Sequence, residues 1–286
     1  MNLIGVVHLA RAKNGIKPFE DFLRSYRLHP AGISHDFIII YKGFDTPSDA
    51  AEWERLAADI PHRTIQVSDE GFDLRAYRIA AEQLPNEFVY FLNSFSEILA
   101  DDWLKKTYAL MNHPGVGIVG ATGSWESMLT NASSHSSQIP RSSILERLKG
   151  FIRLKGCEMF FDPFPNPHIR TNAFLMRREI LLRVWPKHFC TKRGAYLFEN
   201  GRNSLTNRLK RMGLETLVVG KDGSGYQPTE WNRSNTFRST NVENLCVGDN
   251  QTRLFQNADA QIRLDLAEAA WGQTSPSQID QPPNFH

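Results

Sequence analysis

Polar side chains follow directly after a short apolar run in the first half of the chain. The run covers residues 88–92, and Asn93, Ser94, Ser96 and Glu97 come after it. A short run rich in aromatic and β-branched residues, bounded by turn formers, indicates a buried strand. Ligands of open α/β sheets bind beyond the carboxyl ends of such strands, so this turn is a candidate site. The alternative is a strand that merely turns into a helix.

A carboxylate and three consecutive polar residues are the corresponding candidates in the second half. Glu199 follows an apolar run and precedes a predicted helix, so we expect it at the rim of the sheet. There it could act as a general base, or it could satisfy free N–H groups at that helix terminus. Arg170, Thr171 and Asn172 fall in the middle of a predicted strand. Three polar side chains are unusual there, which indicates ligand contacts or, alternatively, an edge strand or structural hydrogen bonds.

Cations and tryptophans lie in the predicted polar loops. Lys221, Arg233 and Arg238 share one loop, where fixed positive charges could neutralise a phosphate group. Trp125 and Trp231 also lie in polar loops. An exposed indole can stack on a sugar ring, and the alternative is an indole that anchors its loop to the domain.

Length and composition limit the classes of protein that fit. A chain of 286 residues allows one large domain or two modest ones, and 41% hydrophobic with 22% charged residues is typical of a soluble globular protein. The net charge of +2 predicts no nucleic-acid partner. The 3 cysteines form no CxxC pair, so neither a zinc site nor a disulfide framework is expected. The absence of a signal-peptide pattern and of a long apolar run predicts a cytoplasmic protein.

The elements that must position these residues alternate between strands and helices. Apolar runs predict strands at residues 3–10, 37–41, 64–67, 88–92, 116–119, 168–176 and 215–219. Apolar residues at helical spacing lie between them, and this alternation predicts a mostly parallel sheet with right-handed crossovers. His8, within the first strand, is expected to be a core histidine with satisfied hydrogen bonds. Residues 122–141 are expected to form a loop, and residues 143–155 a basic amphipathic helix that packs on the domain or lies on a membrane surface.

Four segments occur in an order that resembles GT-A glycosyltransferases, in particular the large inverting family of bacterial polysaccharide transferases. They are VVHLARAKNG, DEGFDLRAYRIAAE, FVYFLNSFSEILADDWL, and the pair NPHIRTNAFLMRRE and FENGRNSLTNRLKRMG. The resemblance covers roughly residues 1–220. It implies a GT-A fold, with a Rossmann-like central sheet flanked by helices. It also implies transfer of a sugar, of the hexosyltransferase type, from a nucleotide-diphosphate donor to a bacterial cell-surface glycan or lipid-linked glycan.

The resemblance also implies roles for particular residues. Glu199 would be the base, and Asn93 and Ser94 would lie against the donor ribose or diphosphate. Arg170, Thr171, Asn172, Trp125 and Trp231 would contact the acceptor or the sugar, and Lys221, Arg233 and Arg238 the diphosphate. Ala10, Arg11, Asp69 and Arg75 would contact the nucleotide. Turn formation and helix capping are the alternative for Asp69 and for the neighbouring Asp73.

One departure from the family concerns the metal. The family carries Asp-x-Asp, or a close variant, after the central strand, and those carboxylates hold a divalent cation. Here the turn offers Asn93, Ser94 and, as its one carboxylate, Glu97. Hard cations prefer several oxygen ligands, usually including carboxylates. A Mn or Mg ion at Glu97 therefore stays an open alternative to neutralisation by Lys or Arg, and so does an inactive protein.

Taken together, the sequence predicts a single α/β domain in two halves. Residues 1–120 would bind the nucleotide sugar, residues 121–255 would form the acceptor side, and residues 256–286 a C-terminal helix and flexible tail. A non-catalytic GT-A-like binding or scaffold module is the main alternative. A nucleotidyltransferase is a further one, but it would need a glycine-rich phosphate loop, and the first turn, LARAKNG, holds a single glycine.

Overall fold

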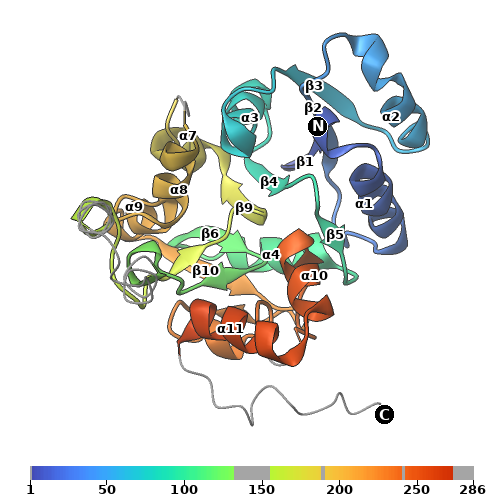
Figure 1. Cartoon of the computed structure of the whole chain (residues 1–286). Coiled ribbons are helices and arrows are strands. Elements are labelled where there is room, and N and C mark those ends of the chain that lie inside the picture. Colours follow the sequence, from blue (N-terminus) through green and yellow to red (C-terminus); the bar gives the residue numbers. More distant parts are fainter. Residues whose placement is uncertain (1, 132–154, 188–190, 240–241, 273–286) are drawn as a thin grey trace, which may run out of the picture.

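The protein is an α/β domain built on one eight-stranded sheet. The structure is a computed structural model, and it describes residues 2–131, 155–187, 191–239 and 242–272. The strands lie in the order β11–β10–β6–β9–β4–β1–β2–β3 (Figure 1). Their bounds are β1 Ile4–Arg11, β2 Asp36–Lys42, β3 Arg63–Val67, β4 Phe88–Leu92, β6 Val116–Gly120, β9 Ala173–Arg177, β10 Glu215–Val219 and β11 Gly225–Tyr226. Of these, β9 and β11 run antiparallel to their neighbours and the rest run parallel, so the predicted mostly parallel α/β fold is confirmed.

Helices cover both faces of the sheet. The helices are α1 Lys17–Leu28, α2 Ala51–Leu56, α3 Phe72–Gln83, α4 Trp103–Met111, α7 Arg178–Val184, α8 Lys192–Asn200, α9 Leu205–Arg211, α10 Asn250–Asn257 and α11 Ala260–Trp271. Strand side chains alternate between faces, so Val7 belongs to the core cluster that contains residues of α3, α8 and α9, whereas Val6 belongs to the cluster that contains residues of α1 and α4. Figure 1 shows α7, α8 and α9 gathered at one side of the sheet and α1 and α2 at the other. Both faces are therefore core, which explains the unbroken apolar runs.

The predicted strand at residues 168–176 is in fact two strands. β8 (His168–Ile169) pairs with β7 (Gly123–Ser124) in a small separate sheet, while β9 joins the main sheet. Arg170, Thr171 and Asn172 form the turn between them, so their placement in the middle of a strand was wrong. The strand is interrupted there because the backbone amide of Arg170 donates to the carbonyl of Thr122, which does not belong to the strands that pair with β9.

The segment before the last helix also differs from the prediction. A two-stranded sheet pairs β12 (Val247–Gly248) with β5 (Glu97–Ile98), and α10 follows at once. The side chain of Asp249 accepts from the backbone amides of Gln251 and Thr252 and so caps this helix. The sequence analysis did not predict α10, although an aspartate before an apolar residue at helical spacing signals such a start.

His8 is a core residue without hydrogen bonds. Its ring stacks on Phe22 with centroids 3.7 Å apart, and no residue in the described part of the chain bonds either ring nitrogen. The predicted core position is confirmed, but the predicted hydrogen bonds are absent from the described residues. Burial lowers the pKa of His8 from 6.5 to about 3.

His8 should make folding stability fall in mild acid. The unfolded chain binds a proton at this residue below about pH 6.5 and the folded chain does not, so stability is lost as pH falls below that value, by up to about 1.4 kcal/mol per unit. We expect His8→Phe to reduce this slope between pH 6.5 and 4 in urea unfolding curves. His113→Gln, at an exposed histidine, is the control and should leave the slope unchanged. Equal slopes in His8→Phe and wild type would contradict the assignment.

Candidate functional site

Two polar turns distant in sequence meet at the edge of the sheet. β4 pairs with β9 so that Leu92 lies opposite Ala173, and the backbone amide of Asn93 donates to the carbonyl of Asn172 at 2.8 Å. The turn after β4 and the turn before β9 are therefore neighbours. β4 runs parallel to β1, so both turns lie at the edge where β1, β2 and β3 also end.

The side chain of Asn93 holds the first turn together. Its Oδ1 accepts from the backbone amide of Phe95 at 3.0 Å and from the Ser96 hydroxyl at 3.1 Å. The Ser94 hydroxyl is buried and has no hydrogen-bond partner among the described residues. Asn93 thus acts first as a turn-forming residue, and Ser94 has an unused hydroxyl group.

Glu199 reaches the second turn from the last turn of α8. The Thr171 hydroxyl donates a hydrogen bond to Glu199 Oε1. Burial raises the pKa of the Glu199 carboxyl above its usual value, while the Thr171 hydrogen bond and the nearby Arg170 charge oppose that rise. Glu199 does not cap the next helix, because Ser204 caps α9. Glu199 adjoins the turn at the edge of the sheet, as expected, but it lies within a helix, α8, that the sequence analysis did not predict.

A second carboxylate, Asp73, lies in the first turn of α3, near enough to Glu199 for its charge to act on that residue. Burial raises the pKa of Asp73 as well, and the charge of Asp69 adds to that rise, while Lys42 and Arg11 oppose it. The charge of Asp73 in turn contributes to the raised pKa of Glu199, after the larger effect of burial. The Tyr77 hydroxyl, near both, is buried without a partner in the described residues. The sequence analysis treated Asp73 as a turn or capping residue, but Gly71 holds the N-cap position of α3. Nothing in the local sequence pairs Asp73 with Glu199.

Charged residues of the first half gather at the ends of β1, β2 and β3. Arg11 and Lys13 both pair with Asp69, at 2.7 and 2.9 Å, and the Arg11 hydrogen bond is the main cause that lowers the pKa of Asp69 to about 2. Lys42 is buried and donates to the carbonyl of Glu70 at 2.7 Å. Arg75 bonds the Ser68 hydroxyl at 2.9 Å. The predicted nucleotide residues Arg11, Asp69 and Arg75 thus lie together, and Ala10 is buried in β1 beside them.

Arg170 is held on several sides. Its guanidinium pairs with the buried carboxylate of Asp249 at 2.8 Å, contacts the Thr122 hydroxyl at 3.3 Å, and lies 4.2 Å from the ring centre of Phe237. Thr122 also donates to Asn172 Oδ1 at 2.8 Å. These contacts fix the second turn to α10 and to the loop before it.

Glu97 is paired with a cation rather than with other carboxylates. Arg253 of α10 donates to Glu97 Oε2 at 3.0 Å and to the carbonyl of Phe95 at 3.2 Å. In the described part of the chain, no three His, Cys, Asp or Glu side chains are grouped so that they could hold a metal ion. A lone carboxylate already paired with arginine is a poor donor set for Mg²⁺ or Mn²⁺, so the residues of this turn do not fit a divalent metal.

The two candidate tryptophans are both anchored to the domain. The indole of Trp231 is 1% exposed, packs against Gly123 and donates to the carbonyl of Tyr226 at 2.9 Å, so it has no free face for a sugar. Trp125 is half-buried, donates to the carbonyl of Pro228 at 2.8 Å and packs edge-on against Trp271. For Trp231 the expected sugar contact is therefore wrong.

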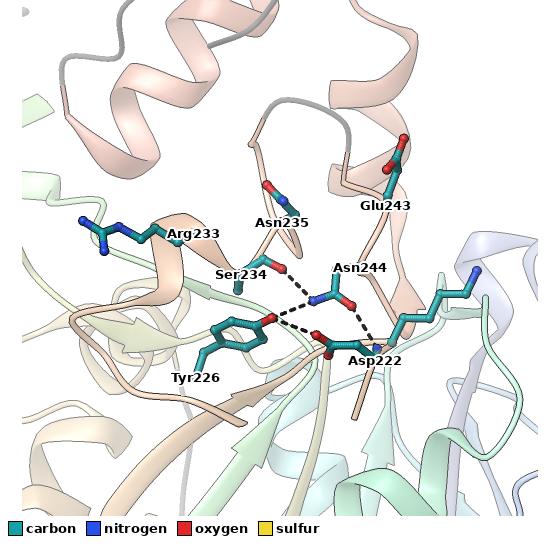
Figure 2. A pocket seen from close by; sticks show the side chains of 8 residues that line it. Asp222, Tyr226, Arg233, Ser234, Asn235, Glu243 and Asn244 are labelled. Carbon is teal, nitrogen blue, oxygen red and sulfur yellow. Dashed lines mark hydrogen bonds between the residues drawn. The ribbon is translucent and has the colours of Figure 1, made fainter. Parts of the chain in front are cut away.

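The three candidate diphosphate cations do not share one site. Lys221 and Arg233 line a pocket of about 480 Å³ beyond β10, together with Asp222, Tyr226 and Asn244. Figure 2 shows Tyr226 and Asn244 bonded within this pocket, while the side chain of Arg233 points away from them. Arg238, in contrast, is buried, 3.4 Å from Glu126, and near Arg170.

Membrane contact is not addressed by the described residues. The expected amphipathic helix at 143–155 lies outside them apart from Lys155, and so do residues 132–141 of the expected loop. Among the helices that are described, none combines the length and the apolar character needed to span a bilayer.

Comparisons with known proteins were made at the level of sequence and of structure. No protein-family model matches the sequence, and no curated protein does. A mannosyltransferase from Pyrobaculum calidifontis is similar in structure, with 16% identity, a TM-score of 0.49, and coverage of 82% of this chain and 59% of that chain. A 4-diphosphocytidyl-2C-methyl-D-erythritol synthase from Anaerococcus prevotii has 14% identity, a TM-score of 0.45, and coverage of 76% and 88%. TarS from S. aureus has 17% identity, a TM-score of 0.34, and coverage of 42% and 34%.

These likenesses concern the fold alone. Glycosyltransferases are thus among the solved structures to which this chain is similar, and the chain spans about three fifths of the mannosyltransferase it matches. Since each TM-score is below 0.5, no functional argument rests on them.

The buried acid Glu199 should destabilise the fold at neutral pH. Its folded-state pKa is raised, so the stability lost through its ionisation appears as pH rises above about 4.5. Glu199→Gln, whose amide oxygen can still accept from Thr171, should therefore unfold at a higher temperature than wild type at pH 7, and the difference should vanish near pH 4. Glu52→Gln, at an exposed glutamate, should show no such difference. A Glu199→Gln protein that is less stable at pH 7 would contradict the buried placement.

Proposed function

We propose that the protein is an inverting glycosyltransferase that moves a sugar from a nucleotide-diphosphate donor to a glycan acceptor. The observation that carries the proposal is the position of Glu199, a half-buried carboxylate bonded to Thr171 in the turn that adjoins the polar turn after β4. Transfer with inversion needs a base that takes the proton of the acceptor hydroxyl as it attacks the sugar. The raised pKa of Glu199 suits that role, because a base works best when its pKa approaches the operating pH.

The donor would bind across the ends of β1 to β4. Arg11, Lys13 and Arg75 supply positive charge there, and Asp69 offers a carboxylate for a base or ribose group. Asn93 and Ser94 border the same edge, opposite Glu199. Arg170 and Asn172, in the turn that adjoins Glu199, would contact the sugar or the acceptor. The acceptor class, a bacterial cell-surface glycan, is proposed from the sequence resemblance.

Nucleotide binding and transfer can be tested separately. We expect the purified protein to bind UDP, GDP or dTDP in calorimetry, and a panel of nucleotide sugars to yield the free nucleoside diphosphate. Glu199→Gln should bind the same nucleotide within about twofold but lose activity about 100- to 10,000-fold, the usual contribution of a general base. Thr171→Val, which keeps the carboxylate, should lose less. Full activity in Glu199→Gln would reject the base assignment.

Metal dependence gives an independent test. Because the residues at the turn after β4 do not fit a divalent cation, we expect EDTA to leave the activity within about twofold of its original value. Complete loss in EDTA, with recovery on adding manganese, would contradict this expectation.

A second candidate function is a non-catalytic binding module of the same fold. The observation that favours it is the pairing of Glu97 with Arg253, which leaves no free carboxylate pair for a metal. Nucleotide binding without turnover of any nucleotide sugar would support this alternative over the enzyme.

A further inference from the structure

We infer that Arg253 is the fixed cation that binds the donor diphosphate, at the turn where a metal ion would otherwise lie. This inference rests on the proposed nucleotide-diphosphate donor and concerns how that donor is held. The sequence analysis assigned the role to Lys221, Arg233 and Arg238 instead. In the structure the first two line a separate pocket, and Arg238 is buried beside Glu126.

The position of Arg253 supports this role. Its guanidinium contacts both Glu97 and the backbone carbonyl of Phe95, so it lies against the turn that begins at Asn93. This turn follows the carboxyl end of β4, where ligands of such sheets bind. A guanidinium has five N–H donors, and these two contacts leave others for an anion. The side chain is 38% exposed, so an incoming ligand can reach it.

Arg253 is also held rigidly in place, which a fixed charge requires. It lies one helical turn after Asp249, and residues four apart share one face of a helix. Asp249 caps α10 and pairs with Arg170, while β12 ties the chain just before it to β5. One short helix therefore holds both polar turns of the site, one through Asp249 and the other through Arg253.

Charge and unused donors at the turn complete the argument. Glu97 is the one carboxylate there, and its charge is offset by Arg253, so the pair leaves no net charge to repel a phosphate. The buried Ser94 hydroxyl and Asn172 Nδ2 have no partners among the described residues. A bidentate guanidinium contact to phosphate is strong and directional, and it can take the place of a metal as the group that holds the phosphate.

The test compares two variants that lose the same ion pair. Arg253→Gln removes the cation, and Glu97→Gln removes only its partner. Binding of UDP, GDP and dTDP, each with its parent nucleoside, is measured by calorimetry in EDTA for the full-length protein, with melting temperatures recorded alongside. We expect Arg253→Gln to bind the best-bound diphosphate about 10- to 100-fold more weakly, with nucleoside affinity unchanged. Glu97→Gln should bind the diphosphate as well as wild type or better, since the arginine is then released for the phosphate.

The outcomes separate this inference from the proposed function. If wild type binds none of UDP, GDP and dTDP, the donor proposal fails, and the inference fails with it. If wild type binds a diphosphate and Arg253→Gln binds it equally well, the inference alone is wrong. Equal losses in Arg253→Gln and Glu97→Gln would mean that the ion pair is structural. A selective loss in Arg233→Gln instead would return the role to the pocket of Figure 2.

Discussion

The antiparallel pairing of β9 with β4 is the constraint on which the site depends. It joins the backbone of Asn93 to that of Asn172, 79 positions later in the chain, and so brings two polar turns to one edge of the sheet. Two further parts of the candidate site attach to these turns. Glu199 attaches through Thr171, and α10 attaches through Arg170 and Glu97. A strand inserted between parallel neighbours therefore connects the two halves of the chain.

Charge is distributed unequally over this edge. In the ion pairs Asp69–Arg11 and Asp249–Arg170, the positive charge of the guanidinium balances the negative charge of the carboxylate. Asp73 and Glu199 are different, because burial is the largest influence on both and raises the pKa of each carboxyl. Groups with perturbed pKa values concentrate at functional sites, so these two carboxyls are the first candidates for the chemistry proposed above. Keeping these acids away from water lowers the folding stability, a loss that is common at functional sites.

The sequence predicted the sheet well because its strands are buried on both faces. Unbroken apolar runs such as that of β4 have few other interpretations, and the ranges of β1, β2 and β10 were also close. The turn at Arg170 was missed because a strand, a polar turn and a second strand read as one run. Whether Trp231 is exposed depends on its packing against Gly123, a contact between distant segments.

The candidate site was predictable only in part, for the same reason. Glu199 and Asn93 were found because each lies next to an apolar run that ends at the rim. Arg253 and Asp73 were not, since their roles come from tertiary contacts, with Glu97 and with Glu199, that local spacing does not encode. The predicted division at residue 120 also gave no indication that α10 contacts both halves, through Arg253 to Glu97 and through its capping residue Asp249 to Arg170.

Hydrogen exchange with and without a bound nucleoside diphosphate tests the central claim most directly. If the two turns and α8 form one donor site, UDP or GDP should slow exchange together in peptides covering residues 93–97, 170–172 and 199, and in the start of α10. Protection confined to the loop around Lys221 and Asn244, with these peptides unchanged, would contradict the account.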